Sequence, residues 1–177
     1  MLTLKMSDAA VKVLGVLDGF TGLEPPAGLA AELRPHVESG FSQHDDVITW
    51  ADSSAVVDKS AREHFDLTGW ECAASLLHLE DFVPVTVGHH NGRPIIAEAD
   101  QRVLLQHGIA LARTLARQVY TLVPRIGVRF IIDANDTNAT FRFHRIRPGE
   151  EWNLPDLDTY INSKPVVVDI EPFDRIG

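Results

Sequence analysis

The chain has a single cysteine, Cys72, among its 177 residues, so no internal disulfide framework is available to it. It also lacks long apolar runs. The apolar stretch at residues 9–17 is interrupted by Lys12, whereas a membrane span needs about 20 consecutive apolar residues. No basic leader or small-residue cleavage site accompanies this stretch. These absences predict a soluble, cytoplasmic protein.

Several sequence signatures of catalysis are also missing. The chain contains no G-x-x-x-x-G-K-[ST], G-x-G-x-x-G, G-x-S-x-G, H-E-x-x-H or C-x-x-C motif. Nucleotide hydrolysis, dinucleotide binding of the usual kind and serine-hydrolase chemistry are therefore disfavoured. We accordingly assign no catalytic residue, cofactor or metal ligand from the sequence.

The length and composition predict one globular domain over residues 1–177, because 45% of the residues are hydrophobic and 23% are charged. The net charge of −9 is unevenly distributed. Residues 1–100 carry 16 acidic and 6 basic residues, residues 101–147 are basic, and residues 148–177 are acidic again. Acidic surfaces repel nucleic acid and anionic membranes and attract basic proteins. A basic protein is therefore the expected partner, and the oligomeric state stays open.

Local patterns predict helices first and strands last. Capping and periodicity favour helices over residues 8–18, capped by Ser7, and over 27–34, while residues 41–58 fit either a strand or a helix. Thr68 and Glu71 have the spacing of a capping box, and this predicts a helix with Trp70, Ala73, Ala74 and Leu77 on one face. A long helix is expected over 98–123, since acidic residues begin it and Pro124 follows it.

Alternating apolar residues predict strands at 128–133 and 140–147, joined as a hairpin, and the apolar run at 165–170 predicts a third strand paired with it. Residues 81–96 are expected to be extended chain with a turn at Asn91–Gly92. The predicted fold is α+β, with several N-terminal helices and one long central helix packed on a small antiparallel sheet. The C-terminal hairpin and the last strand form most of that sheet.

Four groups of residues have side chains suited to chemistry. His89 and His90 adjoin the predicted turn, but neighbouring residues of an extended chain point to opposite faces and do not readily share one metal ion. His44, Asp45 and Asp46 fit an acid–base or metal role, and the two aspartates also fit the N-terminus of a helix. Cys72 fits either a reactive thiol or a buried small residue. Arg129, Arg142 and His144 share the outer face of the predicted hairpin, where they fit either binding of a phosphate or carboxylate or a neutralised surface.

The residues 137–152 (TNATFRFHRIRPGEEW), together with LDTY at 157–160 and PVVVDI at 165–170, resemble the C-terminal parts of small bacterial immunity proteins. Those proteins neutralise the toxin domains of contact-dependent and polymorphic toxin systems. The resemblance covers about a quarter of the chain and no functional residue is transferred from it. It implies a non-enzymatic inhibitor that binds a toxin domain.

The leading hypothesis is therefore an inhibitor that binds a basic toxin domain through an acidic surface. The candidate partner-binding residues are Asp45, Asp46, Glu150, Glu151, Asp156 and Asp158. Two alternatives remain at this point: a small metal-dependent enzyme that uses His89 or His90 with an acid such as Asp45, and a structural or oligomeric subunit without chemistry of its own.

Overall fold

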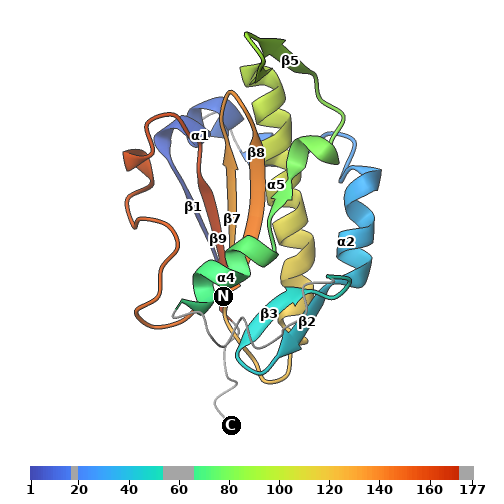
Figure 1. Ribbon diagram of the computed structural model, residues 1–177, viewed down its shortest axis with the longest axis vertical. Coiled ribbons are helices and arrows are strands. Elements are labelled where there is room, and N and C mark those ends of the chain that lie inside the picture. The colour runs from blue at the N-terminus through green and yellow to red at the C-terminus, as the bar shows by residue number, and fades with distance from the viewer. Residues whose placement is uncertain (17–19, 54–65, 172–177) are drawn as a thin grey trace.

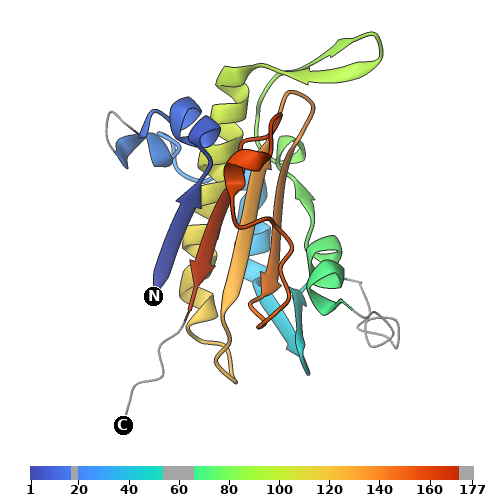
Figure 2. The ribbon, with the colours of Figure 1, turned by 90° about the vertical axis from the view of Figure 1, so that its left-hand side faces the viewer.

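The computed structural model describes residues 1–16, 20–53 and 66–171. These residues form a five-stranded antiparallel sheet with the long helix on its inner face and a long loop across its outer face (Figures 1 and 2). The protein is thus of the α+β class, as the sequence predicts.

The sheet has the strand order β1–β9–β7–β8–β4. Its centre is the predicted hairpin of β7 (Val128–Ala134) and β8 (Ala139–Arg145), and the predicted last strand, β9 (Val166–Ile170), pairs with β7. Two edge strands were not predicted: β1 (Leu2–Met6), which pairs with β9, and the two-residue β4 (Leu77–His78), which pairs with β8. β4 has only two residues, too few for alternation to identify it, whereas β1 (LTLKM) alternates apolar and polar residues over the length of a short strand.

The long helix α5 (Glu98–Val119) packs on the inner face of β7, β8 and β9 and supplies much of the core. The helix approaches the sheet closely at Gly108, where an added Cβ would lie only 2.5 Å from Cγ2 of Ile132. The helix was predicted where it occurs, but it ends at Val119 rather than at Val123. No helix among the described residues has the length and apolarity that crossing a bilayer requires.

At the N-terminus, α1 (Asp8–Leu14) begins as predicted, because the Ser7 hydroxyl accepts a hydrogen bond from the backbone N–H of Ala10. The helix ends at Gly15, which adopts a left-handed conformation. It is therefore shorter than the predicted 8–18, and residues 17 and 18 of that range lie outside the described residues. A short 3-10 helix, η2 (Phe20–Leu23), follows.

The second predicted helix was misplaced. Residues 31–39 form the 3-10 helix η3 (Ala31–Leu33) followed by α2 (Arg34–Ser39), so Pro35 lies in the first turn of α2 instead of ending a helix over 27–34. Proline is tolerated there because the first N–H groups of a helix have no partner within the helix.

Residues 41–50 form a hairpin of β2 (Phe41–His44) and β3 (Val47–Trp50). Asp45 and Asp46 make its turn, with Asp45 at φ 51°, so the reading of these residues as a helix N-terminus was wrong. Residues 54–58 of the ambiguous segment lie outside the described residues. The predicted turn at Asn91–Gly92 is confirmed, and it joins β5 (Val87–His90) to β6 (Arg93–Ile96).

The predicted helix near residue 70 is α4 (Leu67–Ala74), but its cap and its buried face differ from the prediction. Asp66 caps it by accepting from the N–H of Gly69 at 3.0 Å, and the buried side chains are those of Thr68, Glu71 and Cys72. The capping-box spacing gave a wrong prediction of the cap because the Glu71 carboxylate is buried and bonds to Ile48, Arg145 and Arg147. Two further 3-10 helices are η4 (Leu79–Asp81) and η5 (Leu157–Thr159).

Candidate functional site

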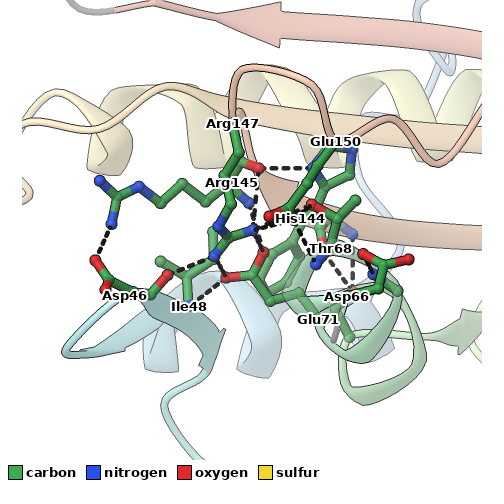
Figure 3. Close-up of polar contacts among 12 residues, drawn as sticks. Asp46, Ile48, Asp66, Thr68, Glu71, His144, Arg145, Arg147 and Glu150 are labelled. Atoms are coloured by element: carbon green, nitrogen blue, oxygen red, sulfur yellow. Dashed lines mark hydrogen bonds and ion pairs between the residues drawn. The ribbon is translucent and has the colours of Figure 1, made fainter. Parts of the chain in front are cut away.

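The most concentrated group of polar contacts surrounds Glu71, whose side chain is fully buried (Figure 3). One carboxylate oxygen accepts from the backbone N–H of Ile48 at 2.8 Å, and the other accepts from that of Arg145 at 2.9 Å. The Arg147 guanidinium adds two parallel hydrogen bonds, at 2.7 and 2.8 Å. Each carboxylate oxygen of Glu71 therefore accepts two hydrogen bonds from other groups of the protein.

Arg147 connects this buried carboxylate to the surface. It also donates to the backbone carbonyl of Asp46 and to the Thr68 hydroxyl, and it lies 4.0 Å from Glu150. Burial on its own lowers the pKa of Arg147, but the bonds to Glu71 outweigh it and the pKa is raised. Arg147 thus stays charged, and the geometry of its bonds to Glu71 is that of a structural clamp between α4, the β2–β3 hairpin and the end of β8.

The same group of side chains closes the outer edge of β8. Along this edge the N–H of Ala139 bonds to Glu80 and that of Arg145 bonds to Glu71. The Ser75 hydroxyl bonds to both the N–H and the carbonyl of Phe143, each at 2.8 Å. The two residues of β4 pair with the strand between these points. These side chains therefore satisfy backbone hydrogen-bonding groups that a further strand would otherwise pair with. The role of the Glu71 cluster is thus to stabilise the fold.

The outer face of the sheet is covered by residues 146–165, which we call the outer loop (Figure 2). Four hydrogen bonds hold the outer loop in place. Asp133 accepts from the Ser163 hydroxyl at 2.7 Å and from the N–H of Lys164 at 2.9 Å. Lys164 also donates to Gln101 on α5, and Asp158 accepts from the N–H of Asp8 at 2.7 Å. The loop therefore presents its remaining side chains on an ordered framework.

Three large apolar side chains of the outer loop face solvent. Trp152 is 43% exposed, Leu154 is 54% exposed and Ile161 is 91% exposed. The Trp152 ring lies 5.6 Å from the guanidinium carbon of Arg142 and close to Gly69 of α4, so one side of it is held while the other remains open. Exposed aromatic and aliphatic groups on a fixed loop are typical of protein-binding surfaces.

The outer loop also carries acidic side chains. Glu151, Asp156 and Asp158 are exposed on the outer loop, and Glu150 is partly buried because it accepts from the Thr68 hydroxyl at 2.7 Å. Asp45 and Asp46 lie on another element, the turn of the β2–β3 hairpin. Asp46 bonds there to Arg145 at 3.1 Å, and its backbone carbonyl accepts from Arg147, which also approaches Glu150. The structure thus brings four of the six predicted partner-binding residues together on one loop.

Most of the side chains on the predicted arginine-bearing face have interaction partners within the protein. Arg129 binds Asp169 through two hydrogen bonds, at 2.7 and 2.9 Å, and these bonds raise its pKa. Arg142 lies over Trp152. His144 is almost fully buried, and its Nδ1 lies 2.7 Å from the carbonyl of Arg145 while its Nε2 has no partner among the described groups. The carboxylate that Arg129 binds is therefore that of Asp169 in the same chain.

The remaining candidates do not converge on one site. His89 and His90 lie in the exposed hairpin of β5 and β6, at the opposite end of the molecule from the Asp45 turn (Figure 1). Cys72 is buried, and burial raises the pKa of its thiol to about 12, so the buried reading is confirmed. Among the residues that the structure describes, no three His, Cys, Asp or Glu side chains are grouped so as to hold a metal ion.

Comparison with known protein families gives one match, in which the model of the Uncharacterized protein PM0498 family covers residues 24–176. The chain belongs to this family. None of the curated proteins compared with it matches, and none of the solved structures does. The part shared with the PM0498 family contains the Glu71 cluster and the whole outer loop, whereas β1 and α1 precede it.

Proposed function

We propose that this protein is a binding inhibitor of the immunity-protein class, which neutralises a basic toxin domain by contact through the outer loop. The observation that carries the proposal is the composition of that loop. It combines the exposed apolar groups of Trp152, Leu154 and Ile161 with the exposed carboxylates of Glu151, Asp156 and Asp158.

The two kinds of side chain have different physical roles in such an interface. A tryptophan and its aliphatic neighbours supply the buried centre, where a few side chains carry most of the binding energy. The carboxylates form a rim that attracts a basic partner and raises the association rate, and salt weakens this attraction. Because the outer loop is bonded to α1, α5 and β7 through Asp158, Lys164 and Ser163, little conformational entropy is lost on binding.

The resemblance of residues 137–152 to the C-terminal parts of immunity proteins supports the same class, since this stretch leads from β8 into the outer loop. It does not identify the toxin, and the partner is therefore described by its chemistry alone: a folded domain with a basic surface and an apolar pocket that receives Trp152.

The test uses two sets of neutral, nearly isosteric substitutions. The first combines Glu151→Gln, Asp156→Asn and Asp158→Asn, which removes three charges and keeps the hydrogen-bond acceptors at residues 156 and 158. The control combines Glu32→Gln, Glu38→Gln and Glu98→Gln, which removes three exposed charges away from the outer loop. Tagged wild type and both variants are used to capture partners from the native lysate at low and high salt.

We expect one stoichiometric basic partner that the wild type and the control capture and the outer-loop variant loses. The purified partner should then lose its toxic activity when the wild-type protein is added, and Trp152→Ala should weaken that inhibition more than either charge variant. Equal capture by both charge variants, or a partner whose activity the protein leaves unchanged, would contradict the proposal.

A further inference from the structure

The opposite edge of the sheet, at β1, differs from the β8 edge in having unused backbone groups. Met1 and Glu171 bond to each other through their backbones, and the N–H of Ser7 bonds to the carbonyl of Pro165. In an antiparallel pair these positions alternate, so residues 1, 3, 5 and 7 face β9. The N–H and carbonyl groups of Leu2, Leu4 and Met6 consequently face away from the sheet.

These outward groups have no hydrogen-bond partner within residues 1–16, 20–53 and 66–171. Three donors and three acceptors are thus aligned along one open strand, which is the template that an additional strand requires. On the β8 edge the equivalent groups are bonded by Glu80, Ser75 and Glu71.

A groove of about 410 Å³ lies beside this edge, on the side of the sheet that faces α5. Its apolar lining includes Leu2, which is 47% exposed, and also Leu29 and Ala110. In an added strand every second side chain would point to the same face as Leu2 and enter the groove. The edge and the groove therefore form one site for an extended chain.

The charge of this site is opposite to that of the protein as a whole. Arg113 and Arg117 of α5 line the groove, whereas Lys5 of β1 lies on the opposite face of the sheet, beside Arg129 and Glu151. Glu24 bonds to Arg113, whereas Arg117 has no ion-pair or hydrogen-bond partner among the described residues. In a chain of net charge −9 this local excess of positive charge selects an acidic occupant.

We propose that the β1 edge binds an extended, acidic segment of a partner protein by strand addition, with alternate side chains of that segment in the groove. This site is separate from the outer loop and does not depend on the function proposed above. Its backbone bonds supply affinity for any extended chain, and Arg117 with Arg113 supplies selectivity for acidic side chains.

The test measures binding of a fluorescein-labelled eight-residue peptide of alternating glutamate and valine to the full chain by fluorescence anisotropy. A peptide of alternating lysine and valine is the charge control. Two further peptides carry N-methyl groups, one on every glutamate and the other on every valine. Since alternate N–H groups of a strand face opposite edges, strand addition predicts that one methylated peptide loses binding and the other keeps it.

On the protein side, Leu4→Pro removes an outward N–H and should abolish binding, and Arg117→Glu should weaken it at least about tenfold. Lys12→Glu on α1 makes the same charge change away from the groove and should leave binding almost unaltered. Absence of binding up to about 1 mM peptide would overturn the proposal, because even weak specific complexes form in that range.

Two other outcomes would also overturn it. Equal binding of both methylated peptides would reduce the interaction to charge attraction without strand pairing. A concentration-dependent dimer in sedimentation experiments, returned to monomer by Leu4→Pro, would assign the edge to a second copy of the chain. The lysate capture that tests the outer loop is unaffected by either result.

Discussion

The two edges of the sheet differ in how their backbone groups are satisfied. At the β8 edge, side chains from α4 and from the segment after it bond to Ala139, Phe143 and Arg145, and β4 pairs with the strand between them. The buried Glu71–Arg147 pair anchors this arrangement. At the β1 edge, the outward groups of Leu2, Leu4 and Met6 have no such partners among the described residues. Where side chains bond to the backbone groups of an edge, those groups stabilise the fold and cannot pair with another chain. Where the backbone groups are unbonded and lie beside a groove, they can pair with an added strand.

The largest expected effect concerns the anchor of the closed edge. Glu71→Ala leaves the Arg147 guanidinium and the N–H groups of Ile48 and Arg145 without their carboxylate. Loss of one partner of a buried ion pair typically costs about 3–5 kcal/mol, and we expect a loss of this size in urea-induced unfolding. Glu32→Ala, on an exposed side chain, serves as the control and should change stability by less than about 0.5 kcal/mol.

A loss below about 1 kcal/mol for Glu71→Ala would contradict the assignment of a structural clamp, because that is the range of exposed ion pairs. Should the alanine variant fail to fold, Glu71→Gln keeps one acceptor and two donors at the same place. Its stability should lie between those of the wild type and the alanine variant.

Ser75 provides the next test of the closed edge. Ser75→Ala removes the hydroxyl that bonds to both backbone groups of Phe143, and these groups lie in the buried interior. A buried polar group left without a partner costs about 1–3 kcal/mol, so we expect a loss of about 2 kcal/mol in the free energy of unfolding. A change near zero would mean that water replaces the hydroxyl and that the edge is less closed than the bonds indicate.

The sequence predicted the centre of the sheet well because alternation over residues 128–133 and 140–145 reflects a sheet with one face on α5. It failed at both edges, for physical reasons. The spacing of Thr68 and Glu71 fits a helix cap as well as a buried clamp, and only the fold shows that Arg147 approaches Glu71. The five residues of β1 do alternate apolar and polar side chains, but the sequence does not show that they pair with β9 near the other end of the chain.

The candidate surface could be predicted only in part. The acidic residues of the outer loop were selected because charge is visible in a sequence, and Glu151, Asp156 and Asp158 are exposed. Exposure of Trp152, Leu154 and Ile161 was not predictable, since apolar residues are usually buried and their position depends on how the loop crosses the sheet. Asp45 and Asp46 were grouped with the loop by charge, but the fold places them on a separate hairpin.

A pair of proline substitutions compares the two sides of β1 directly. Thr3→Pro removes an N–H that faces β9, whereas Leu4→Pro removes one that faces the open edge. Because the Leu4 side chain packs against the core, each proline variant is compared with the alanine variant at the same position. Relative to alanine, we expect Thr3→Pro to cost about 1–2 kcal/mol more than Leu4→Pro in urea unfolding, since only Thr3→Pro breaks a bond of the sheet. Equal costs would show that the outward N–H of Leu4 has a partner, and the strand-addition site would then lose its basis.

The smallest expected effect concerns His144, which lies near the closed edge with Arg129, Arg147 and Asp169 around it. Burial lowers the pKa of His144, and the neighbouring arginines act in the same direction. In the unfolded chain the imidazole gains a proton near its ordinary pKa of about 6.5, while the folded chain keeps it neutral to lower pH. The unfolded state then binds more protons, so stability must fall as the pH decreases through that range.

For one such group the slope is at most about 1.4 kcal/mol per pH unit between pH 7 and the lowered pKa. His144→Asn keeps a donor for the Arg145 carbonyl and removes the titration, so unfolding free energies measured from pH 7 to pH 5 should fall less steeply than in the wild type. His107, whose pKa burial also lowers, accounts for part of the remaining slope. An unchanged slope in His144→Asn would mean that this imidazole reaches solvent in the folded protein.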